Sequence, residues 1–328
     1  MSRRFGIAAV FAAAALAIGA CGDDDDSSGG GGEDGVEKSA LKVSYVPYVG
    51  AAPFILGIEQ GFFEERGLQI EDSQGAAPAP IMAQVVSGQL DIGFTTIPAL
   101  ISAVSGGAPL KAISPFDGII DPENPQGAIL VKQDSGITGP KDLEGKQVGV
   151  VALQSELDVL LQEVVERDGG DPSQVESVQI PFPEMNAALD AGRVDAVVNV
   201  EPFLTQAKDQ GGFEEISYPE VEVVPEQAVT AFVASDQFIE ENPDTVEQFR
   251  AAMEESLQYA ADNPEEAQDT MTEVGEIEPD LLRRINLGLI FDPVLDEESI
   301  ESFTTLMEKH EFVEDAPPAS ELLAQGGE

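Results

Sequence analysis

Four polar side chains in two similar stretches of the sequence have the spacing of a small-molecule binding site. Thr95 and Thr96 follow a short apolar run, and Asn199 and Glu201 follow a second such run later in the chain. Hydroxyl, amide and carboxylate groups all form hydrogen bonds with polar ligands. A nearly continuous apolar run is typical of a strand buried in a parallel sheet, and open α/β sheets bind ligands beyond the carboxyl ends of such strands. The pattern therefore predicts that these four side chains can contact a ligand.

The two stretches are copies of one pattern, which residues 87–100 and 191–204 repeat at a constant offset. The matched pairs are Gly88 with Gly192, Asp91 with Asp195, Pro98 with Pro202 and Leu100 with Leu204. Each copy has a glycine that ends a helix, a buried strand, and a proline that opens the next helix. The first strands of the two halves, around Val43 and Val148, repeat at a similar offset. We therefore expect two β-α-β-α-β units that are built alike.

The residues that most enzymes use for catalysis are scarce in this sequence. The chain has one histidine, His310, and one cysteine, Cys21, which argues against Ser-His-Asp, Cys-His and histidine-rich metal arrangements. His310 stands among charged neighbours and is expected to be a solvated surface residue. Pairs of carboxylates stay possible, because 62 Asp and Glu residues make their adjacency uninformative. The sequence predicts a binding protein rather than an enzyme, with no catalytic residues, no metal site and no cofactor.

The charge of the chain excludes one class of partner. Asp and Glu total 62 against 16 Lys and Arg, so the formal net charge is −46. Such a surface repels nucleic acid and anionic lipid, and we expect no nucleic-acid partner. A salt-adapted or generally acidic proteome would explain the same charge. At 328 residues with 42% hydrophobic residues, the chain is long enough for about two domains with separate cores.

The amino terminus predicts export. Residues 1–20 combine a basic start with an apolar segment too short to span a bilayer and a small-residue cleavage site, as in a secretory signal peptide. Ile18-Gly19-Ala20-Cys21 resembles the bacterial lipobox, which implies cleavage before Cys21 and lipidation of its thiol. Residues 21–40 are rich in Asp and Gly and are expected to be a flexible tether. With a single cysteine, no disulfide can form within the chain.

Strand and helix patterns alternate through both halves, which favours an α/β fold with parallel β-α-β units. The halves are separated by a dense cluster of helix and strand breakers, which marks a crossing between domains. These breakers are Pro115, Gly118, Pro122, Pro125 and Gly127.

The C-terminal third is predicted to be mainly helical. Residues 229–234 are expected to form one more strand, which returns beside the strand at residues 128–132. Asn242 and Asn263 each precede a proline, and we expect each to cap the helix that follows. These helices need a sheet to cover, and the first half is the expected one.

The ordered motifs of residues 41–310 resemble the extracytoplasmic solute-binding lipoproteins of ABC importers. The likeness is to the branch that includes sulfonate, taurine, nitrate and thiamine-precursor binding proteins. The residues that carry it are Ala52-Pro53-Phe54, Gly61-Phe62-Phe63, Gly67-Leu68, Ser87-Gly88-Gln89-Leu90-Asp91, Gly136-Ile137, Lys141-Asp142-Leu143-Glu144-Gly145-Lys146, Ala187-Ala188-Leu189, Gly192-Arg193-Val194-Asp195-Ala196, Glu201-Pro202-Phe203, Asn242-Pro243 and residues 259–264.

The resemblance implies a two-lobed fold of the type II periplasmic-binding-protein kind, in which each lobe is a mainly parallel sheet flanked by helices. Lobe 1 would be residues 41–117 and 237–315, lobe 2 residues 118–236, and residues 316–328 a polar tail. The lobes would close on a ligand about a hinge, and the importer would recognise the closed form.

The resemblance also implies ligand-binding positions at the strand-helix corners and the hinge. These positions are Tyr45, Tyr48, Ala51, Thr95, Thr96, Phe116, Asp117, Gln154, Ser155, Asn199 and Glu201. Relatives often have a Gly-Ser or Gly-Thr helix start at 154–155 and a tryptophan in the pocket, and this chain has neither. No Lys or Arg falls at a predicted position, whereas Asp117 and Glu201 do. We therefore expect a neutral or amine-bearing ligand such as a pyrimidine, although either acid could instead cap a helix or bond within the hinge.

Three functions compete on these grounds. The first is a monomeric lipid-anchored receptor on the outer face of the cytoplasmic membrane, which delivers a small solute to an ABC importer permease. Within that class, a sulfonate or nitrate receptor is the alternative to a pyrimidine receptor. The second is a surface lipoprotein that senses a ligand without import. The third is a synthase of the thiamine-precursor type, which would need a histidine and a cysteine cluster that the sequence lacks.

Overall fold

The computed structural model describes residues 35–117, 119–120, 123–225, 227–274, 277–285, 289–290 and 295–324. The predicted signal peptide, the lipidated Cys21 and most of the predicted tether lie outside the described residues. Of the helices that are described, none combines the length and the apolar character that a bilayer crossing requires.

The first sheet has the strand order β2-β1-β3-β11-β4. Its strands are β1 (Ala40–Tyr45), β2 (Gln69–Gln74), β3 (Ile92–Thr96), β4 (Leu110–Pro115) and β11 (Thr230–Ser235). β1 pairs in parallel with β2 and β3, and β11 runs antiparallel to both of its neighbours. β3 and β11 are buried along most of their length, as expected for strands covered on both faces.

The second sheet has the order β10-β6-β9-β7-β8 and repeats the first. Its strands are β6 (Gly127–Lys132), β7 (Gln147–Val150), β8 (Glu176–Gln179), β9 (Ala196–Val200) and β10 (Phe213–Ser217). β7 pairs in parallel with β8 and β9, and β6 runs antiparallel to β9 and β10. In each sheet, three parallel strands are thus followed by one antiparallel strand, β11 or β6, and then by a strand, β4 or β10, that runs in the direction of the first three. The predicted α/β architecture with two similar halves is confirmed.

The position of β11 differs from the prediction. β11 pairs with β3 and β4, whereas the strand at 128–132, β6, pairs with β9 and β10. The prediction that the two strands lie side by side is therefore wrong, and β11 belongs to the first sheet although the predicted lobe boundary placed it in lobe 2. Each parallel triplet leaves one strand, β3 or β9, with an open edge, and β11 and β6 fill these edges. The apolar sequence of β11 suits either edge, so only packing decides between them.

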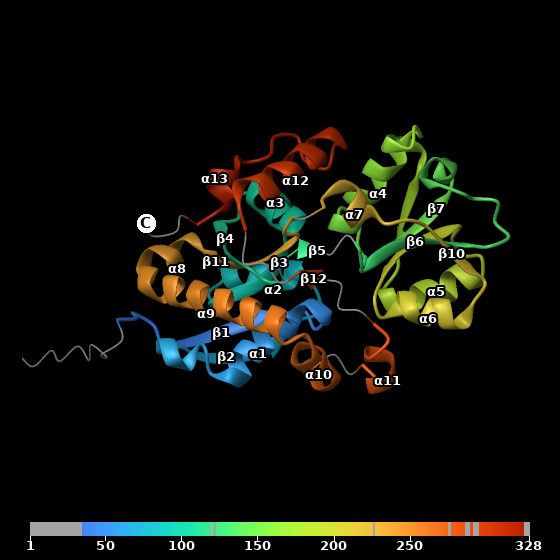
Figure 1. Cartoon of the computed structure of the whole chain (residues 1–328). Helices are drawn as coiled ribbons and strands as arrows, with labels where there is room; N and C mark the ends of the chain where they lie inside the picture. The colour runs from blue at the N-terminus through green and yellow to red at the C-terminus, as the bar shows by residue number, and fades with distance from the viewer. Residues whose placement is uncertain are drawn as a thin grey trace, which may run out of the picture. The chain divides into compact units, whose positions relative to one another are not determined.

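Helices surround both sheets (Figure 1). Those after the strands of the first half are α1 (Ala52–Gln60), α2 (Pro78–Val86) and α3 (Ile97–Ser105), and those of the second half are α4 (Glu156–Arg167), α5 (Phe182–Asp190), α6 (Phe203–Gln210) and α7 (Pro219–Val223). The C-terminal helices are α8 (Asp236–Glu241), α9 (Pro243–Asp262), α10 (Pro264–Val274), α11 (Pro279–Leu282), α12 (Glu297–Lys309) and α13 (Ala319–Leu322). The short strands β5 (Ile119–Ile120) and β12 (Leu289–Ile290) pair with each other.

The long helix α9 covers the first half, as predicted, and packs against α1 (Figure 1). Its start at Pro243 is also as predicted, but Asn242 forms no capping hydrogen bond. The amide of Asn242 instead donates backward to the Phe238 carbonyl (3.0 Å), and the amide of Asn263 donates to the Tyr259 carbonyl (2.9 Å). Both asparagines follow a preceding helix, whose last carbonyls need donors. The asparagine side chains therefore donate to the end of the preceding helix and do not cap the next one, although capping had been predicted.

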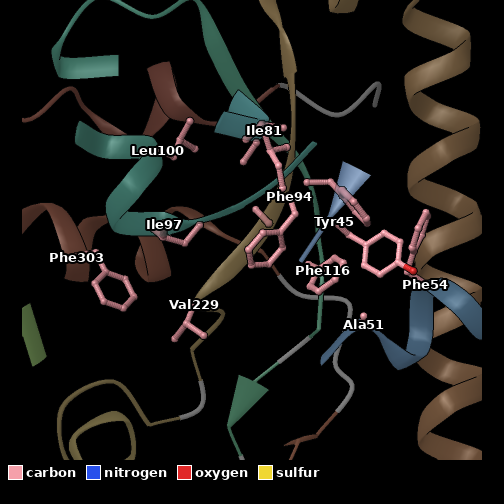
Figure 2. Close-up of a cluster of buried hydrophobic side chains, with 14 of the residues drawn as sticks. Tyr45, Ala51, Phe54, Ile81, Phe94, Ile97, Leu100, Phe116, Val229 and Phe303 are labelled. Carbon is pink, nitrogen blue, oxygen red and sulfur yellow. The ribbon is translucent and has the colours of Figure 1, made fainter. Parts of the chain in front are cut away.

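Aromatic rings form the centre of the first core (Figure 2). Phe232 of β11 meets Phe54 and Phe116 at ring-centroid distances of 5.0 Å each, and Phe249 of α9 at 5.3 Å, all in edge-on geometry. Such edge-to-face pairs add stability beyond the area that they bury. The cluster holds Phe116, and with it the end of β4, in a fixed place.

Both ends of the described chain are attached to the first half. The sequence analysis had instead predicted a flexible tether at residues 21–40 and a polar tail at residues 316–328. Glu37 accepts hydrogen bonds from the backbone of Asp244 and Thr245 (3.2 and 3.0 Å) at the start of α9. In the predicted polar tail, Leu322 is fully buried, and the amide of Ala324 donates to the Ala112 carbonyl of β4 (2.9 Å). A helix of four residues is too short for its apolar face to show as a period in the sequence.

Candidate functional site

Asp117 lies just beyond the end of β4 and is almost completely buried, with 1% of its surface exposed. Its Oδ2 accepts a hydrogen bond from the Tyr48 hydroxyl and its Oδ1 accepts one from the Thr230 hydroxyl. Burial raises the pKa of Asp117 to about 6, although both hydroxyls favour the ionised form. Tyr48 and Asp117 were predicted from the sequence. Thr230 was missed, because β11 was expected in the other sheet.

The same corner carries a wall of aromatic rings. Phe94 and Phe116 lie 4.7 Å apart between ring centroids, and the Tyr48 ring lies 5.8 and 5.9 Å from them. Phe94 and Phe116 are visible in Figure 2. Gly50 allows this arrangement, because a Cβ atom there would lie 2.6 Å from both Asp117 Oδ2 and the Tyr48 ring. The corner thus combines an apolar surface with a buried carboxyl group, as small-molecule sites do.

Two more carboxyl groups are buried nearby. Glu156 is the first residue of α4 and Glu220 lies on α7, which packs against α4, and each is 7% exposed. Burial, together with repulsion from Glu220 and Asp117, raises the pKa of Glu156 well above its ordinary value. Burial also raises the pKa of Glu220 to about 7, although a hydrogen bond with Glu156 acts in the opposite direction. Two carboxyls at hydrogen-bonding distance cannot both ionise easily, so the pair shares a proton.

Asp117, Glu156 and Glu220 are called the acidic cluster below. Three buried polar atoms in and beside it, Ser155 Oγ, Glu156 Oε1 and Glu220 Oε2, have no hydrogen-bond partner among the residues that the structure describes. Gly127, the first residue of β6, lets the Glu220 carboxyl group pack closely against this strand, because a Cβ there would lie 2.6 Å from Oε2. Buried polar atoms are normally hydrogen-bonded, so these three atoms indicate a place where a ligand can bind. Ser155 was predicted, but Glu156 and Glu220 were missed.

The residues of the second repeated stretch that were predicted to bind a ligand form hydrogen bonds within the protein. Asn199 is fully buried, and its amide donates to Asn186 Oδ1 (3.0 Å) while its oxygen accepts from the Val200 amide (3.0 Å). The two oxygens of Glu201 accept from the backbone and hydroxyl of Thr205 (3.0 and 2.9 Å). Burial raises the pKa of Glu201, against both of these bonds. The capping alternative considered for Glu201 therefore describes its contacts in this structure.

The first copy behaves similarly. Thr96 caps α3 by accepting from the Ala99 amide (3.4 Å), and Thr95 is fully buried with its hydroxyl against Met82 Sδ (3.2 Å). Tyr45 and Ala51 lie in the hydrophobic core (Figure 2).

Gln154 is exposed and has a left-handed backbone with φ 59°, and its backbone N–H donates to Asp158 Oδ2 (2.8 Å). Of the eleven predicted positions, the structure brings Tyr48, Phe116, Asp117 and Ser155 to the acidic cluster. Whether any of the eleven contacts a ligand stays a prediction.

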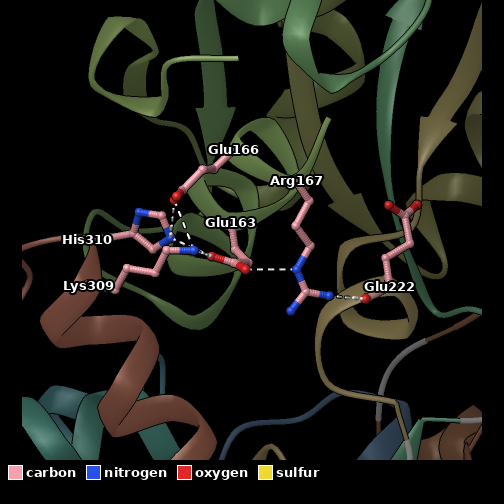
Figure 3. Close-up of polar contacts among 6 residues, drawn as sticks. All are labelled: Glu163, Glu166, Arg167, Glu222, Lys309 and His310. Atoms are coloured by element: carbon pink, nitrogen blue, oxygen red, sulfur yellow. Dashed lines mark hydrogen bonds and ion pairs between the residues drawn. The ribbon is translucent and has the colours of Figure 1, made fainter. Parts of the chain in front are cut away.

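A second set of charged side chains, in which Glu163 and His310 are buried, lies further along α4 and is called the α4–α12 cluster (Figure 3). Glu163 accepts from Lys309 Nζ and Arg167 Nε (2.7 Å each), and His310 Nε2 lies 2.8 Å from it. Burial alone would raise the pKa of Glu163, but these hydrogen bonds hold it at about 2. His310 has only 5% of its side chain exposed, so its prediction as a solvated residue is wrong. His310 ends α12 and turns onto α4, a contact that its charged sequence neighbours do not reveal.

The α4–α12 cluster also contains Glu166. Oxygens of Glu163 and Glu166 and a nitrogen of His310 lie within 4.8 Å of one another, a spacing that a metal ion could use. Lys309 Nζ already bridges the two carboxylates at 2.7 and 3.0 Å. The Lys309 ammonium group therefore lies between the two carboxylates, where a metal ion would otherwise bind.

A cavity of about 280 Å³ lies elsewhere, between β4, α9 and the C-terminal segment. Arg250 borders it and donates to the carbonyls of Ile113 (2.5 Å) and Ala324 (2.7 Å). This arginine attaches the C-terminal segment to β4. The cavity shares no lining residue with the acidic cluster.

The profile of the family described as NMT1/THI5 like matches residues 49–267. The chain belongs to the NMT1/THI5-like family. It is 23% identical over 285 residues to the formylaminopyrimidine-binding protein of Halalkalibacterium halodurans, covering 85% of this chain and 79% of that protein. It is 26% identical over 235 residues to a putative thiamine biosynthesis protein of Haemophilus influenzae, covering 70% and 71%. The predicted resemblance is confirmed by these matches.

Some of the proteins to which this chain is similar are named as enzymes. The 4-amino-5-hydroxymethyl-2-methylpyrimidine phosphate synthase of Candida albicans is 25% identical to this NMT1/THI5-like chain over 264 residues, covering 76% of this chain and 75% of that one. Among solved structures, the periplasmic aliphatic sulphonate binding protein SsuA of Escherichia coli aligns with a TM-score of 0.73 at 19% identity, covering 88% of this chain and 93% of that one. The nitrate-binding protein NrtA of Synechocystis PCC 6803 aligns with a TM-score of 0.67 at 15% identity, covering 87% and 84%. The predicted periplasmic-binding-protein fold is thus confirmed.

Proposed function

We propose that this NMT1/THI5-like protein is a solute-binding protein that captures a small neutral or amine-bearing molecule and delivers it to an ABC importer. The observation that carries the proposal is the corner where Tyr48, Asp117 and the start of α4 meet. It has an aromatic wall, a buried carboxyl group and buried polar atoms without partners. The names of the family relatives, which include a formylaminopyrimidine-binding protein, support a pyrimidine-like solute.

The proposed movement follows from the fold. The two similar sheets would be the two lobes, with the segments that connect the sheets as the hinge. The lobe boundaries of the sequence analysis would hold except for β11. Binding would favour the closed arrangement, and a permease would recognise it. Lipidation of Cys21 would hold the mature protein at the outer face of the cytoplasmic membrane.

A sulfonate or nitrate ligand is disfavoured by charge. Besides burial, the pKa values of Asp117, Glu156 and Glu220 are shifted by the acids themselves, by two hydroxyls and by a backbone N–H, and no Lys or Arg of the described residues is among these groups. An anion placed there would meet up to three carboxylates without a cation to offset them. We therefore rank the anion receptor below the receptor for a neutral or amine-bearing solute.

Native mass spectrometry of the freshly purified mature chain tests whether it carries a small molecule. A thermal melting panel of pyrimidines, amines, sulfonates and nitrate then tests which class stabilises it. We expect a pyrimidine or amine to raise the melting temperature. If no compound is bound and none stabilises the protein, solute binding is refuted. Co-purification with a permease separates import from sensing.

A further inference from the structure

The acidic cluster holds more negative charge than its surroundings offset. Asp117, Glu156 and Glu220 are each more than nine-tenths buried. The titratable groups that face Glu156 are Glu220 from α7, Asp117 from the end of β4 and the Tyr48 hydroxyl from the loop before α1. The cations at α4, Lys309 and Arg167, contact Glu163. Buried carboxylates without a cation are costly, and proteins keep them where a ligand supplies the opposite charge.

The free hydrogen-bonding capacity of the cluster consists of acceptors. Apart from the proton that the two glutamates share, no described N–H or O–H group donates to Glu156 Oε1 or Glu220 Oε2, and Ser155 Oγ, which can donate or accept, has no described partner either. A ligand that satisfies the two carboxyl oxygens must bring N–H or O–H donors. The proton that the two glutamates share would then be replaced by donors from the ligand.

The surroundings fit an organic cation better than a metal ion. In the described part of the chain, the three-residue group whose metal-ligating atoms lie within 4.8 Å of one another is the α4–α12 cluster. Asp117 of the acidic cluster accepts a hydrogen bond from Tyr48, whose ring packs against Phe94 and Phe116; of these three side chains, the Tyr48 hydroxyl alone could ligate a metal. Aromatic faces attract organic cations, whereas hard metal ions need a shell of oxygen ligands.

We propose that the acidic cluster binds the cationic group of an organic ligand with at least two N–H donors, such as an ammonium or amidinium, and that binding releases the proton shared by Glu156 and Glu220 to solvent. No bond other than this O–H bond is broken, and the ligand cation replaces the proton in the charge balance. This inference rests on the proposed function and assigns its ligand class. The raised pKa values of Glu156 and Glu220 support it, because the pair is partly protonated near neutral pH without a ligand.

Matched probes of equal shape and different charge test the ligand class. Benzamidine and benzamide form one pair, and propylamine and 1-propanol form another. We expect each cation to bind at least about tenfold more tightly than its neutral partner. Equal affinities across both pairs would overturn the inference, and so would stronger stabilisation by Ca²⁺ or Zn²⁺ than by either organic cation.

Proton release is measured by calorimetric titration of benzamidine near pH 6.5 in two buffers with different enthalpies of ionisation. We expect the wild type to release up to one proton. Glu156→Gln and Glu220→Gln should abolish the release and weaken benzamidine about tenfold, whereas Glu176→Gln, at an exposed position on β8, should change neither. Glutamine matches the protonated glutamate in shape, and circular dichroism checks that both variants fold.

The two proposals can fail separately. If a solute is bound but the variants release as many protons as the wild type, the cation site is refuted while solute binding stands. If native mass spectrometry and the melting panel also find no small molecule, both are refuted.

Discussion

Helix α4 carries two buried glutamates in opposite electrostatic surroundings. Glu156 at its first position faces Glu220 and Asp117, whereas Glu163, two turns later, is bound by Lys309, Arg167 and His310. The exposed fractions are similar, 7% and 4%. The pKa of Glu156 is nevertheless raised while that of Glu163 is held at about 2. Burial alone therefore does not set the state of a carboxyl group, because its partners decide the direction.

The opposite pKa shifts distinguish Glu163, whose carboxylate has a structural role, from Glu156, whose carboxyl group is proposed to bind a ligand. Glu163 joins α4 to α12 with cations that the protein supplies itself (Figure 3). Glu156 has an oxygen without a partner among the described residues, and it lies beside predicted ligand-binding positions. The following changes test this comparison, from the largest expected effect to the smallest.

Glu163→Gln should destabilise the protein by about 2 kcal/mol near neutral pH, because buried His310 and half-exposed Arg167 lose their carboxylate while Lys309 keeps Glu166. The folded pKa of Glu163 lies below its ordinary value of 4.5. Its contribution is therefore present above about pH 4.5 and is lost as pH falls towards 2. Urea unfolding of variant and wild type at several pH values measures this, with Glu176→Gln as the control. An unchanged midpoint near neutral pH would contradict the structural role.

Glu220→Gln should stabilise the ligand-free protein by about 2 kcal/mol near pH 8. The folded pKa of about 7 lies above the ordinary 4.5, so the stability linked to Glu220 is full below about pH 4.5 and is lost as pH rises through 7. The gain should therefore vanish near pH 4.5. Thermal unfolding across this range measures it, and a variant that is less stable than wild type near pH 8 would show that the carboxylate is offset by a cation.

Tyr48→Phe should destabilise the protein by about 1 kcal/mol near pH 8, because it removes a donor from buried Asp117. The loss should shrink below about pH 6, where Asp117 becomes protonated and needs fewer donors. Chemical unfolding at the two pH values gives the difference. A loss that is equal at both would mean that packing of the ring, rather than the hydrogen bond, matters at this position.

Glu201→Gln should cost only about 0.5 to 1 kcal/mol, since its oxygens cap the start of α6 through Thr205. Glutamine keeps one acceptor oxygen, so part of the cap survives. Thermal unfolding measures the loss, and benzamidine titration sharpens the comparison with Glu156. If Glu201→Gln weakens benzamidine as much as Glu156→Gln does, Glu201 contacts the ligand as the sequence predicts.

Much of the local structure could be predicted. The glycine and proline of each repeated stretch mark a helix end and the next helix start, and the apolar run between them forms β3 or β9. Tyr48 and Asp117 were named because the family resemblance implies ligand-binding positions at the first strand-helix corner and at the hinge. Glu156 could not be found in this way. An acid in the first turn of a helix usually interacts with the helix dipole, and nothing near it in the sequence shows that Glu220 lies opposite.

The sequence by itself determined most of the strands and helices, the two similar halves and the family, because these depend on local periodicity, turn residues and ordered motifs. Only the tertiary structure decided that β11 closes the first sheet and β6 the second, because two open strand edges accept apolar strands equally well. Only the tertiary structure brought Glu156 of α4 together with Glu220 of α7 and Asp117 of the β4 end. The interaction between two charges depends on their separation in space and on their burial, and the spacing of residues along the sequence gives neither.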